Sequence, residues 1–313
     1  MSANVQPAPS LRRPAWRARI KKNLFLYLMF LPVALYYLIF KYAPMFGLVI
    51  AFKDYNAFVG ILGSKWVGMK YFDQFIHSMY FGRLIRNTLA ISFLDLLVNF
   101  PAPIILALML NEVQHKRLKS VVQTISYLPH FVSTVVIVGI LVNFLSLSTG
   151  LINNILAAVG LQRVHFLAEP RYFWPIFTLM NVWRSVGWSS IIYIAALSGI
   201  DPTLYEAAVV DGAGRWRQLF CVTLPALLPT IVTLLIMRVG HVLDVGYEAI
   251  ILMYNPQIYE TADVISTYVY RRGLIDADYS FAAAVGLFQS LVGMLMVMGA
   301  NALSRKLTET SLW

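Results

Sequence analysis

Four ionisable residues lie near the end of a long apolar segment in this 313-residue chain. They are Arg238, His241, Asp244 and Glu248, and their separations of 3, 3 and 4 residues would place all four on one face of a helix. Ionisable groups at membrane depth are costly and usually face protein or a water-filled path. The spacing therefore predicts either a polar stripe along a transport pathway, or a local Arg–Asp pair beside a seam with another subunit.

A second polar set lies in the preceding apolar segment. Aromatic faces beside a few hydrogen-bonding groups suit sugar rings, which have apolar faces and hydroxyl edges, although aromatic residues are also common in helix packing and at membrane interfaces. The set comprises Asn181, Trp183, Arg184, Trp188 and Tyr193. Asp95, in an earlier apolar segment, is more readily explained by packing or gating.

Between these two segments the chain carries a charged insert, EAAVVDGAGRWRQLFCVTLP, at residues 206–225. Its first residues favour a helix, for which Asp201 or Thr203 could serve as the N-cap and Pro202 suits the first turn. Gly212 and Gly214 permit a sharp change of direction, because glycine alone adopts left-handed backbone geometry without penalty.

After the glycines, residues 215–223 can resume a helix, and Leu224 and Pro225 begin the next apolar segment. The insert is thus predicted to form two short helices at an angle to each other that project from the membrane. Such a projection would suit docking into a groove on a soluble partner.

The amino-acid composition indicates a membrane protein. Hydrophobic residues make up 59% and charged residues 13%, whereas a soluble domain carries about 25% charged residues. The single cysteine, Cys221, excludes an intramolecular disulfide framework, and no two of the five histidines have the spacing of a helical zinc site. The net charge of +10 is better explained by basic residues that anchor topology than by nucleic-acid binding.

Apolar runs of about 20 residues, long enough to cross a bilayer, recur along the chain. They predict an all-α polytopic membrane protein with six spans, at 24–51, 88–111, 121–147, 172–198, 224–252 and 281–303. The expected domains are a basic tail (1–23), a membrane domain (24–303, with the polar loop at 201–225) and a short tail (304–313).

The basic residues orient these spans. Six spans put both termini on one side, and that side receives 13 of the Lys and Arg residues, all in short segments, whereas 9 are spread over the longer loops opposite. Short loops rich in Lys and Arg stay in the cytoplasm. Both termini and the insert are therefore predicted to be cytoplasmic.

The loops on the other side and one proline carry further expectations. Residues 64–87 are predicted to form an interfacial helix, 149–165 a short helix outside the membrane, and 253–280 a loop that reaches toward a partner or substrate. Pro129 should bend the third span. No nucleophile or metal cluster accompanies His130, so a catalytic role for it is not expected.

The insert resembles the EAA loop of the permease subunits of bacterial ABC importers. The resemblance is carried by EAA at 206–208, by Asp211, Gly212 and Ala213, and by Leu224-Pro225. Residues 106–113, 123–133 and 263–290 look like carbohydrate importers of the LplB and YteP type, and the first permease subunit of the alginate importer is similar.

This resemblance implies a type I importer fold and a division of labour. The chain has no GxxxxGK[ST] phosphate loop, so ATP and Mg would be used by a separate pair of ATPase subunits and this chain would be a transport subunit with no cofactor. The other implied partners are a second homologous permease, an extracytoplasmic solute-binding protein, a saccharide and membrane lipid, in the bacterial inner membrane. The residues implied to couple to the ATPase are Glu206, Ala207, Ala208, Asp211, Gly212, Ala213, Leu224 and Pro225.

Two other classes of protein stay open on the residues alone. In an ion- or proton-coupled secondary transporter, the stripe from Arg238 to Glu248 would be a relay, but the sequence shows no inverted repeat and no matching pair of broken spans. A membrane-embedded hydrolase or glycosyltransferase would need a paired acid and base at membrane depth, and none is recognisable.

Overall fold

The computed structural model describes residues 23–308, and most of them are helical. The expected tails therefore lie largely outside the described residues, at 1–22 and 309–313. Besides helices and loops, the described residues form a small antiparallel ladder, β1 (Lys53–Asp54) with β2 (Lys65–Trp66), in which Lys53 pairs with Trp66.

By length and composition, four helices within the described range could cross a membrane: Leu24–Phe52, Phe81–Glu112, Arg215–Gly240 and Tyr279–Lys306. A fifth span results if a bent pair, Lys116–Phe131 with Thr134–Leu145, counts as one. The chain is thus an all-helical membrane protein with four to five candidate spans.

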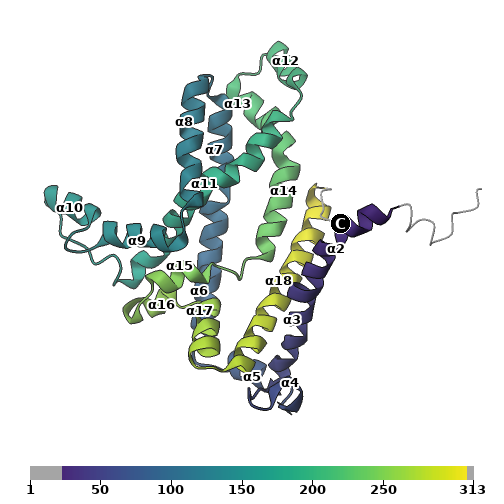
Figure 1. Cartoon of the computed structure of the whole chain (residues 1–313). Coiled ribbons are helices and arrows are strands. Elements are labelled where there is room, and N and C mark those ends of the chain that lie inside the picture. Colours follow the sequence, from purple (N-terminus) through teal and green to yellow (C-terminus); the bar gives the residue numbers. More distant parts are fainter. Residues whose placement is uncertain (1–22, 309–313) are drawn as a thin grey trace, which may run out of the picture.

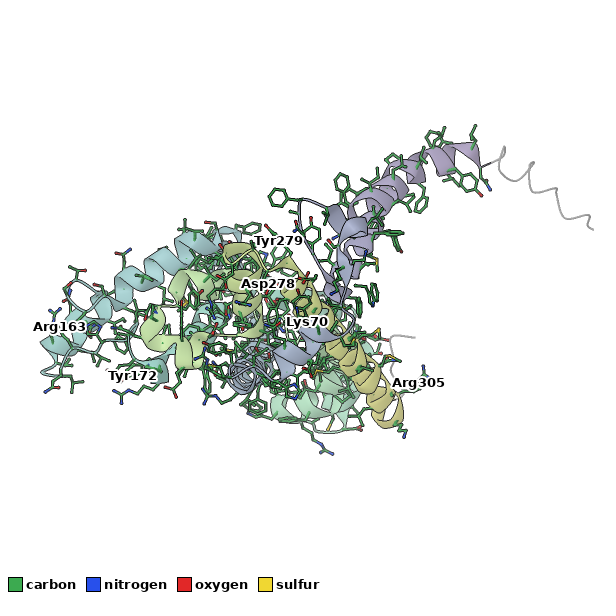
Figure 2. The ribbon with its side chains drawn as sticks, turned by 90° about the horizontal axis from the view of Figure 1, so that it is seen from below. Lys70, Arg163, Tyr172, Asp278, Tyr279 and Arg305 are labelled. Atoms are coloured by element: carbon green, nitrogen blue, oxygen red, sulfur yellow. The ribbon has the colours of Figure 1, made fainter. Side chains whose placement is uncertain are left out.

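The first two spans are each built from several helical pieces. The elements are α2 (Leu24–Tyr37), η1 (Leu38–Tyr42), α3 (Ala43–Met45) and η2 (Phe46–Phe52), then α6 (Phe81–Leu94), η3 (Asp95–Asn99) and α7 (Pro101–Glu112). Helix α2 buries none of its apolar side chains, and Figure 2 shows the N-terminal segment extending away from the rest of the molecule. A helix that is apolar all round needs lipid or another chain around it.

The predicted third span, 121–147, is not one straight helix. Helix α8 (Lys116–Tyr127) continues into η4 (Leu128–Phe131), and α9 (Thr134–Leu145) then departs at 103°. Pro129 lies in η4, so the predicted bend is confirmed. Ser133 begins the new helix by accepting a hydrogen bond from the Val136 N–H.

The predicted fourth span, 172–198, forms α11 (Pro170–Ser198), a 29-residue helix. It is not among the four helices apolar enough to count as a span, because polar residues such as Asn181 and Arg184 lie along its middle. Helix α11 packs along α7 and crosses α8 closely: a Cβ at Gly187 would meet the backbone of Ser126.

The predicted fifth span, 224–252, is wrong at both ends. The helix begins at Arg215, as α13 (Arg215–Gln218) and η5 (Leu219–Thr223), and continues as α14 (Leu224–Gly240). It stops at Gly240, and a new helix, α15 (Tyr247–Met253), begins only after Gly246, whose φ of 72° lies in the left-handed region. The fifth predicted span is therefore broken, contrary to expectation, whereas the break in the third is the bend expected at Pro129. The last span is α18 (Tyr279–Thr308), longer than the predicted 281–303.

Short helices cover the end of the molecule opposite α12 (Pro202–Val210), as Figure 1 shows. The interfacial helix expected at 64–87 is shorter, since Lys70–Ile76 forms α5 and residues from Phe81 on belong to α6. The expected helix within 149–165 is confirmed as α10 (Leu151–Ala158). Residues 253–280 do not form a free loop but pack as short helices: η6 (Pro256–Ile258), α16 (Tyr259–Ala262), α17 (Ile265–Tyr270) and η7 (Arg271–Ile275). Another short helix, α4 (Gly60–Gly63), lies nearer the start of the chain.

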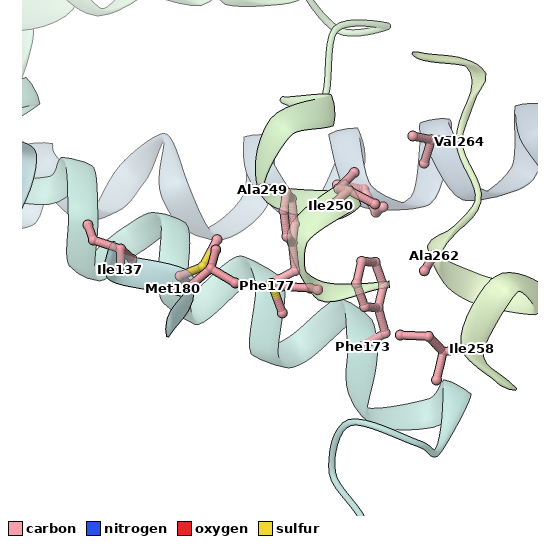
Figure 3. Close-up of a cluster of buried hydrophobic side chains, with 12 residues drawn as sticks. Ile137, Phe173, Phe177, Met180, Ala249, Ile250, Ile258, Ala262 and Val264 are labelled. Carbon is pink, nitrogen blue, oxygen red and sulfur yellow. The ribbon is translucent and has the colours of Figure 1, made fainter. Parts of the chain in front are cut away.

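Apolar clusters join these elements. In Figure 3, Phe173 and Phe177 of α11 lie beside Ile250 of α15 and Ile258 of η6. A second cluster packs α5, α6, α17 and α18 together, with Phe75 at its centre. These clusters hold the broken segments against the long helices.

Candidate functional site

A cavity of about 750 Å³ lies between α6–η3, α11, α14 and the break that follows α14. Seven of the nine side chains predicted to lie on a pathway line it: Asn181, Arg184, Trp188, Tyr193, Arg238, His241 and Asp244. Trp183 and Glu248 do not, and both are exposed elsewhere. This cavity brings residues of the two predicted polar sets together.

A charge pair spans this cavity. The Arg238 Nε donates to Asp95 Oδ2 over 2.7 Å, and joins the end of α14 to the start of η3. The residue sequence favoured Asp244 as the local partner of Arg238, but the carboxylate is supplied from another element, 143 residues away. Arg238 and Asp95 are each partly exposed to the cavity, so the pair is accessible to a passing molecule.

The pair extends into a chain of hydrogen bonds that sequence reasoning missed. Asn99 Nδ2 donates to Asp95 Oδ1 over 2.8 Å, and Ser185 Oγ donates to Asn99 Oδ1 over 2.9 Å. The spacing of Asp95 and Asn99, four residues apart, was the available signal, since such residues share a helix face. The network fixes the Asp95 carboxylate and links η3 to α11.

An aromatic platform forms another part of the wall. The rings of His130 and Trp188 stack with centroids 4.5 Å apart and planes 2° from parallel, and Phe131 meets Trp188 edge-on. His130 lies in η4, directly before the 103° bend. At this bend the imidazole of His130 packs against Trp188, a contact that the sequence did not predict.

The predicted four-residue stripe does not exist as one helical face. Helix α14 ends at Gly240, so His241 and Asp244 lie on the irregular connection and Glu248 lies on α15. The backbone carbonyls freed by this break find partners: Ser92 Oγ donates to the Val242 carbonyl, and Gln289 Nε2 donates to the Leu243 carbonyl. Irregular backbone at membrane depth is tolerated where it is buried in protein or lines a cavity, as here.

What the cavity offers is a polar and aromatic surface for binding. It combines stacked rings, amide and hydroxyl groups and a guanidinium–carboxylate pair, which match the ring faces and hydroxyl edges of a saccharide. Within residues 23–308, no group of three or more His, Cys, Asp or Glu side chains could hold a metal ion. The arrangement suits passage or binding of a polar solute.

The polar insert lies at one end of the molecule, where α12 projects beyond the long helices (Figure 1). The Asp201 Oδ1 accepts a hydrogen bond from the Thr203 N–H over 2.9 Å, and this bond lowers the pKa of Asp201 below its ordinary value. Of the two candidate N-caps, Asp201 is the one used. None of the residues of α12 is buried, which leaves Glu206 and Ala207 exposed.

The turn after α12 depends on one of the two glycines. Gly212 has a φ of 75°, in the left-handed region, whereas Gly214 has an extended conformation and begins α13. The predicted second short helix is not separate, because it runs through η5 into α14. Two hydrogen bonds hold the turn to this helix: Gln218 Nε2 to the Ala213 carbonyl (2.8 Å), and Tyr205 with Thr223 (3.0 Å).

The other predicted coupling residues follow the turn. Asp211 is exposed at the end of α12, and Ala208 and Ala213 are half-buried. Leu224 and Pro225 lie within the continuous helix, at the start of α14. The structure thus gathers residues 206–213 in one exposed projection and places 224–225 at its base.

Comparison with known proteins supports one family. The family described as "Binding-protein-dependent transport system inner membrane component" matches residues 99–309. Protein LplB of Bacillus subtilis (strain 168) is 44% identical over 96% of this chain and 94% of its own length. From the same organism, the polygalacturonan/rhamnogalacturonan transport system permease protein YteP is 46% identical over 92% of this chain and 90% of its own length.

Solved structures agree with these relatives. A chain of a bacterial ABC transporter involved in the import of the acidic polysaccharide alginate superposes with a TM-score of 0.87 at 49% identity, over 93% of this chain and 99% of that one. A chain of the alginate transporter in complex with an alginate pentasaccharide-bound periplasmic protein gives 0.88 at 48% identity, over 96% and 100%.

Proposed function

The chain belongs to the family of binding-protein-dependent transport system inner membrane components, and from this premise we propose that it conducts acidic oligosaccharides or polysaccharide fragments into the cell. As a member of this family it is a multi-pass inner-membrane transport subunit of an ABC importer, not an enzyme. Family membership also sets aside the ion-coupled transporter and the membrane enzyme.

The proposed substrate is supported by the chemistry of the central cavity, taken together with the cargo of two similar proteins. Its stacked His130–Trp188 rings and its Arg238–Asp95 pair offer both ring faces and charge. Two of the most similar proteins are named for the transport of polygalacturonan and rhamnogalacturonan or of alginate, and polygalacturonan and alginate are chains of uronic acids. Arg184 and Arg238 would then contact carboxylates of the cargo, and Asn181, Trp188, Tyr193, His241 and Asp244 would complete the pathway.

The membrane topology follows as part of the same proposal. Helix α11 crosses the membrane inside the assembly, shielded from lipid, and the bent pair α8–α9 is one span, which makes six spans in the domain 24–303. Both termini, with the tails at 1–23 and 304–313, are cytoplasmic. The loop 201–225 then lies on the cytoplasmic side.

In this orientation α12 acts as the coupling helix. Glu206 and Asp211 are exposed for polar contacts with an ATPase, Ala207, Ala208 and Ala213 allow close approach, and Gly212 sets the turn. Leu224 and Pro225, at the start of α14, transmit the movement that the ATPase imposes on α12 into that helix. Two ATPase subunits supply ATP and Mg chemistry, a second permease completes the pathway, and an extracytoplasmic binding protein delivers the saccharide.

Transport by the reconstituted importer tests this function. Proteoliposomes containing both permeases and the ATPases, with the binding protein added outside, should accumulate labelled oligogalacturonate or oligoalginate only when ATP is enclosed. Trp188→Ala should reduce uptake without reducing the assembly of the complex. Uptake that persists without the ATPases, or an importer that accepts neither saccharide, would overturn the proposal.

A further inference from the structure

A second, smaller pocket lies at the opposite end of α6 from the central cavity. It measures about 410 Å³ and is lined by three tyrosines, three arginines and one aspartate: Tyr80, Tyr259, Tyr268, Arg83, Arg271, Arg272 and Asp276. Arg83 precedes Asp95 by twelve residues on this helix, roughly 18 Å along its axis. The pocket lies on the end of the molecule away from α12, among α6, α16 and α17 (Figure 1).

The arginines are held in place by one buried carboxylate. Asp263, whose side chain is 0% exposed, accepts from Arg83 over 3.0 Å and from Arg271 over 2.8 Å at the same oxygen, Oδ2. Its other oxygen accepts from Thr267 over 2.9 Å. One carboxylate therefore neutralises two guanidinium groups only in part, and it lies behind the pocket wall.

The tyrosines fix the planes of these guanidinium groups. Arg83 lies 5.1 Å from the ring centre of Tyr80, and Arg271 lies 5.2 Å from Tyr259 and 5.5 Å from Tyr268. Cation–π contacts of this kind orient a guanidinium while leaving its edge available for hydrogen bonds. The side chains are thus arranged before any ligand arrives.

The arginines that line the pocket have buried nitrogen atoms without hydrogen-bond acceptors. Among the described residues, Arg83 Nε, Arg271 Nη1 and Arg272 Nε are buried and have no partner. Unpaired buried donors are costly and call for an explanation. On the pocket wall itself Asp276 is the one carboxylate, and it pairs with Arg272 over 3.3 Å; Asp278 also pairs with Arg272, over 3.0 Å, from outside the wall.

We propose that this pocket is an outer binding site for one carboxylate-bearing sugar residue of the incoming chain. The partly exposed ring of Tyr80 would receive the sugar ring, and the guanidinium groups of Arg83 and Arg271 would receive its carboxylate, with the geometry that guanidinium favours for such groups. A concave pocket walled by rings suits a cyclic ligand better than an acidic side chain of a protein. The direction of passage, from this site to the central cavity, rests on the proposed function; the site itself does not.

Direct binding tests the site. The complete importer without its binding protein, in nanodiscs, is titrated calorimetrically with digalacturonate and with the neutral galactose disaccharide of the same linkage. The acidic disaccharide should bind at least about tenfold more tightly, and less tightly as salt rises. Equal binding of the two sugars would overturn the proposal.

Variants locate the binding. Tyr80→Ala, at a partly exposed ring, and the charge-balanced pair Arg271→Gln with Asp263→Asn should each weaken digalacturonate binding at least about tenfold. Arg171→Gln is the matched control, because Arg171 also lies over a tyrosine ring, at 4.6 Å, but outside the pocket. If the paired variant fails to assemble, Tyr80→Ala decides alone; unchanged binding in Tyr80→Ala would overturn the proposal.

A central-cavity variant separates the two sites and the two proposals. The part of the digalacturonate binding that depends on Tyr80 should persist in the Trp188→Ala variant, and loss of all binding in Trp188→Ala alone would assign the binding to the central cavity and overturn the outer site. Binding that requires Tyr80, in an importer that transports no saccharide with ATP, would support the site while refuting the proposed function. ATP-driven uptake of oligogalacturonate without detectable binding at the pocket would support the proposed function and refute the outer site.

Discussion

At the scale of single residues, the pair of Arg238 and Asp95 is the contact most directly placed to respond to transport. It joins the last turn of α14 to the first residue of η3 across the central cavity. Asp95 is further fixed by Asn99, whereas Arg238 is held by Asp95 alone among the described hydrogen bonds. An incoming carboxylate would therefore compete with Asp95 for a guanidinium that is free to turn.

We expect Arg238→Gln and Asp95→Asn each to reduce ATP-driven uptake about tenfold, because the remaining charge loses its partner at a cost of about 1–3 kcal/mol. The double variant should recover part of the loss, since a neutral Gln and Asn can still hydrogen-bond. Uptake rates in proteoliposomes, arranged as a double-mutant cycle, measure the coupling. Purely additive losses would mean that the two residues act independently.

The cap of α12 makes a pH-dependent prediction. The Thr203 N–H stabilises the ionised Asp201 and lowers its pKa, so the contribution of the cap is fully present above the ordinary carboxyl pKa near about 4. It is lost as the pH falls through the lower pKa of the folded state. The protection factors of the amides at 203–210, which correct for the slower intrinsic exchange in acid, should therefore fall as the pH drops through that pKa in the wild type.

Two variants at the same position check this assignment. Asp201→Ala should exchange faster than the wild type at neutral pH, because the cap is gone. Asp201→Asn should stay protected at neutral pH and lose the acid dependence, since Asn caps helices about as well as Asp but does not titrate. Equal exchange in all three proteins would show that the cap does not hold α12.

At the scale of elements, the sequence predicted which segments are helical better than where each helix breaks. The polar residues from 238 to 248 kept a helical spacing, yet the helix ends at Gly240 because Ser92 and Gln289 accommodate the freed carbonyls of the connection. Those partners come from distant segments, so no local pattern could reveal them. For the same reason the sequence does not predict the pairing of Arg238 with Asp95, which lie 143 residues apart.

Three other features of the structure could be predicted from neighbouring residues alone. The N-cap at Asp201, the turn at Gly212 and the bend near Pro129 each depend on residues within a few positions, and each was predicted from them. Helix α11 shows the limit of hydropathy: its polar residues face a cavity and neighbouring helices, so a span inside a bundle looks less apolar than one facing lipid.

The turn between α12 and α13 gives a matched pair of glycine variants. Gly212→Ala would force a side chain into left-handed geometry, at about 1–2 kcal/mol, and should tilt α12 and lower ATP-coupled uptake several-fold. Gly214→Ala should have little effect, because its φ of −68° suits any residue and a Cβ there would meet nothing within 4 Å. Coupling is read as uptake per ATP hydrolysed, and equal ratios in both variants would contradict the role given to the turn.

At the scale of the whole molecule, one continuous helix connects the polar insert to the central cavity. Residues 215–240 run unbroken from the turn after α12 to Arg238 and Gly240, a length of roughly 39 Å. A displacement of α12 that passes the turn at 211–214 would therefore be transmitted along one helix to the Arg238–Asp95 pair. The break at 241–246 separates this end from α15, which is anchored in the cluster around Phe173 and Phe177.

This route requires that α12 and the β1–β2 loop lie on opposite sides of the membrane, which labelling can test. Cys221 is the one cysteine of the chain, so Cys221→Ser provides a background for single introduced cysteines at Val210 and Phe58, which are 87% and 99% exposed. In intact cells a membrane-impermeant maleimide should label Phe58→Cys at once and Val210→Cys only after permeabilisation, because short loops rich in Lys and Arg stay in the cytoplasm and the proposed topology places α12 in one of them. If Val210→Cys were labelled at once and Phe58→Cys only after permeabilisation, the orientation would be reversed and α12 would face away from any ATPase. If both were labelled from outside, the helix at 215–240 could not couple a cytoplasmic ATPase to the cavity.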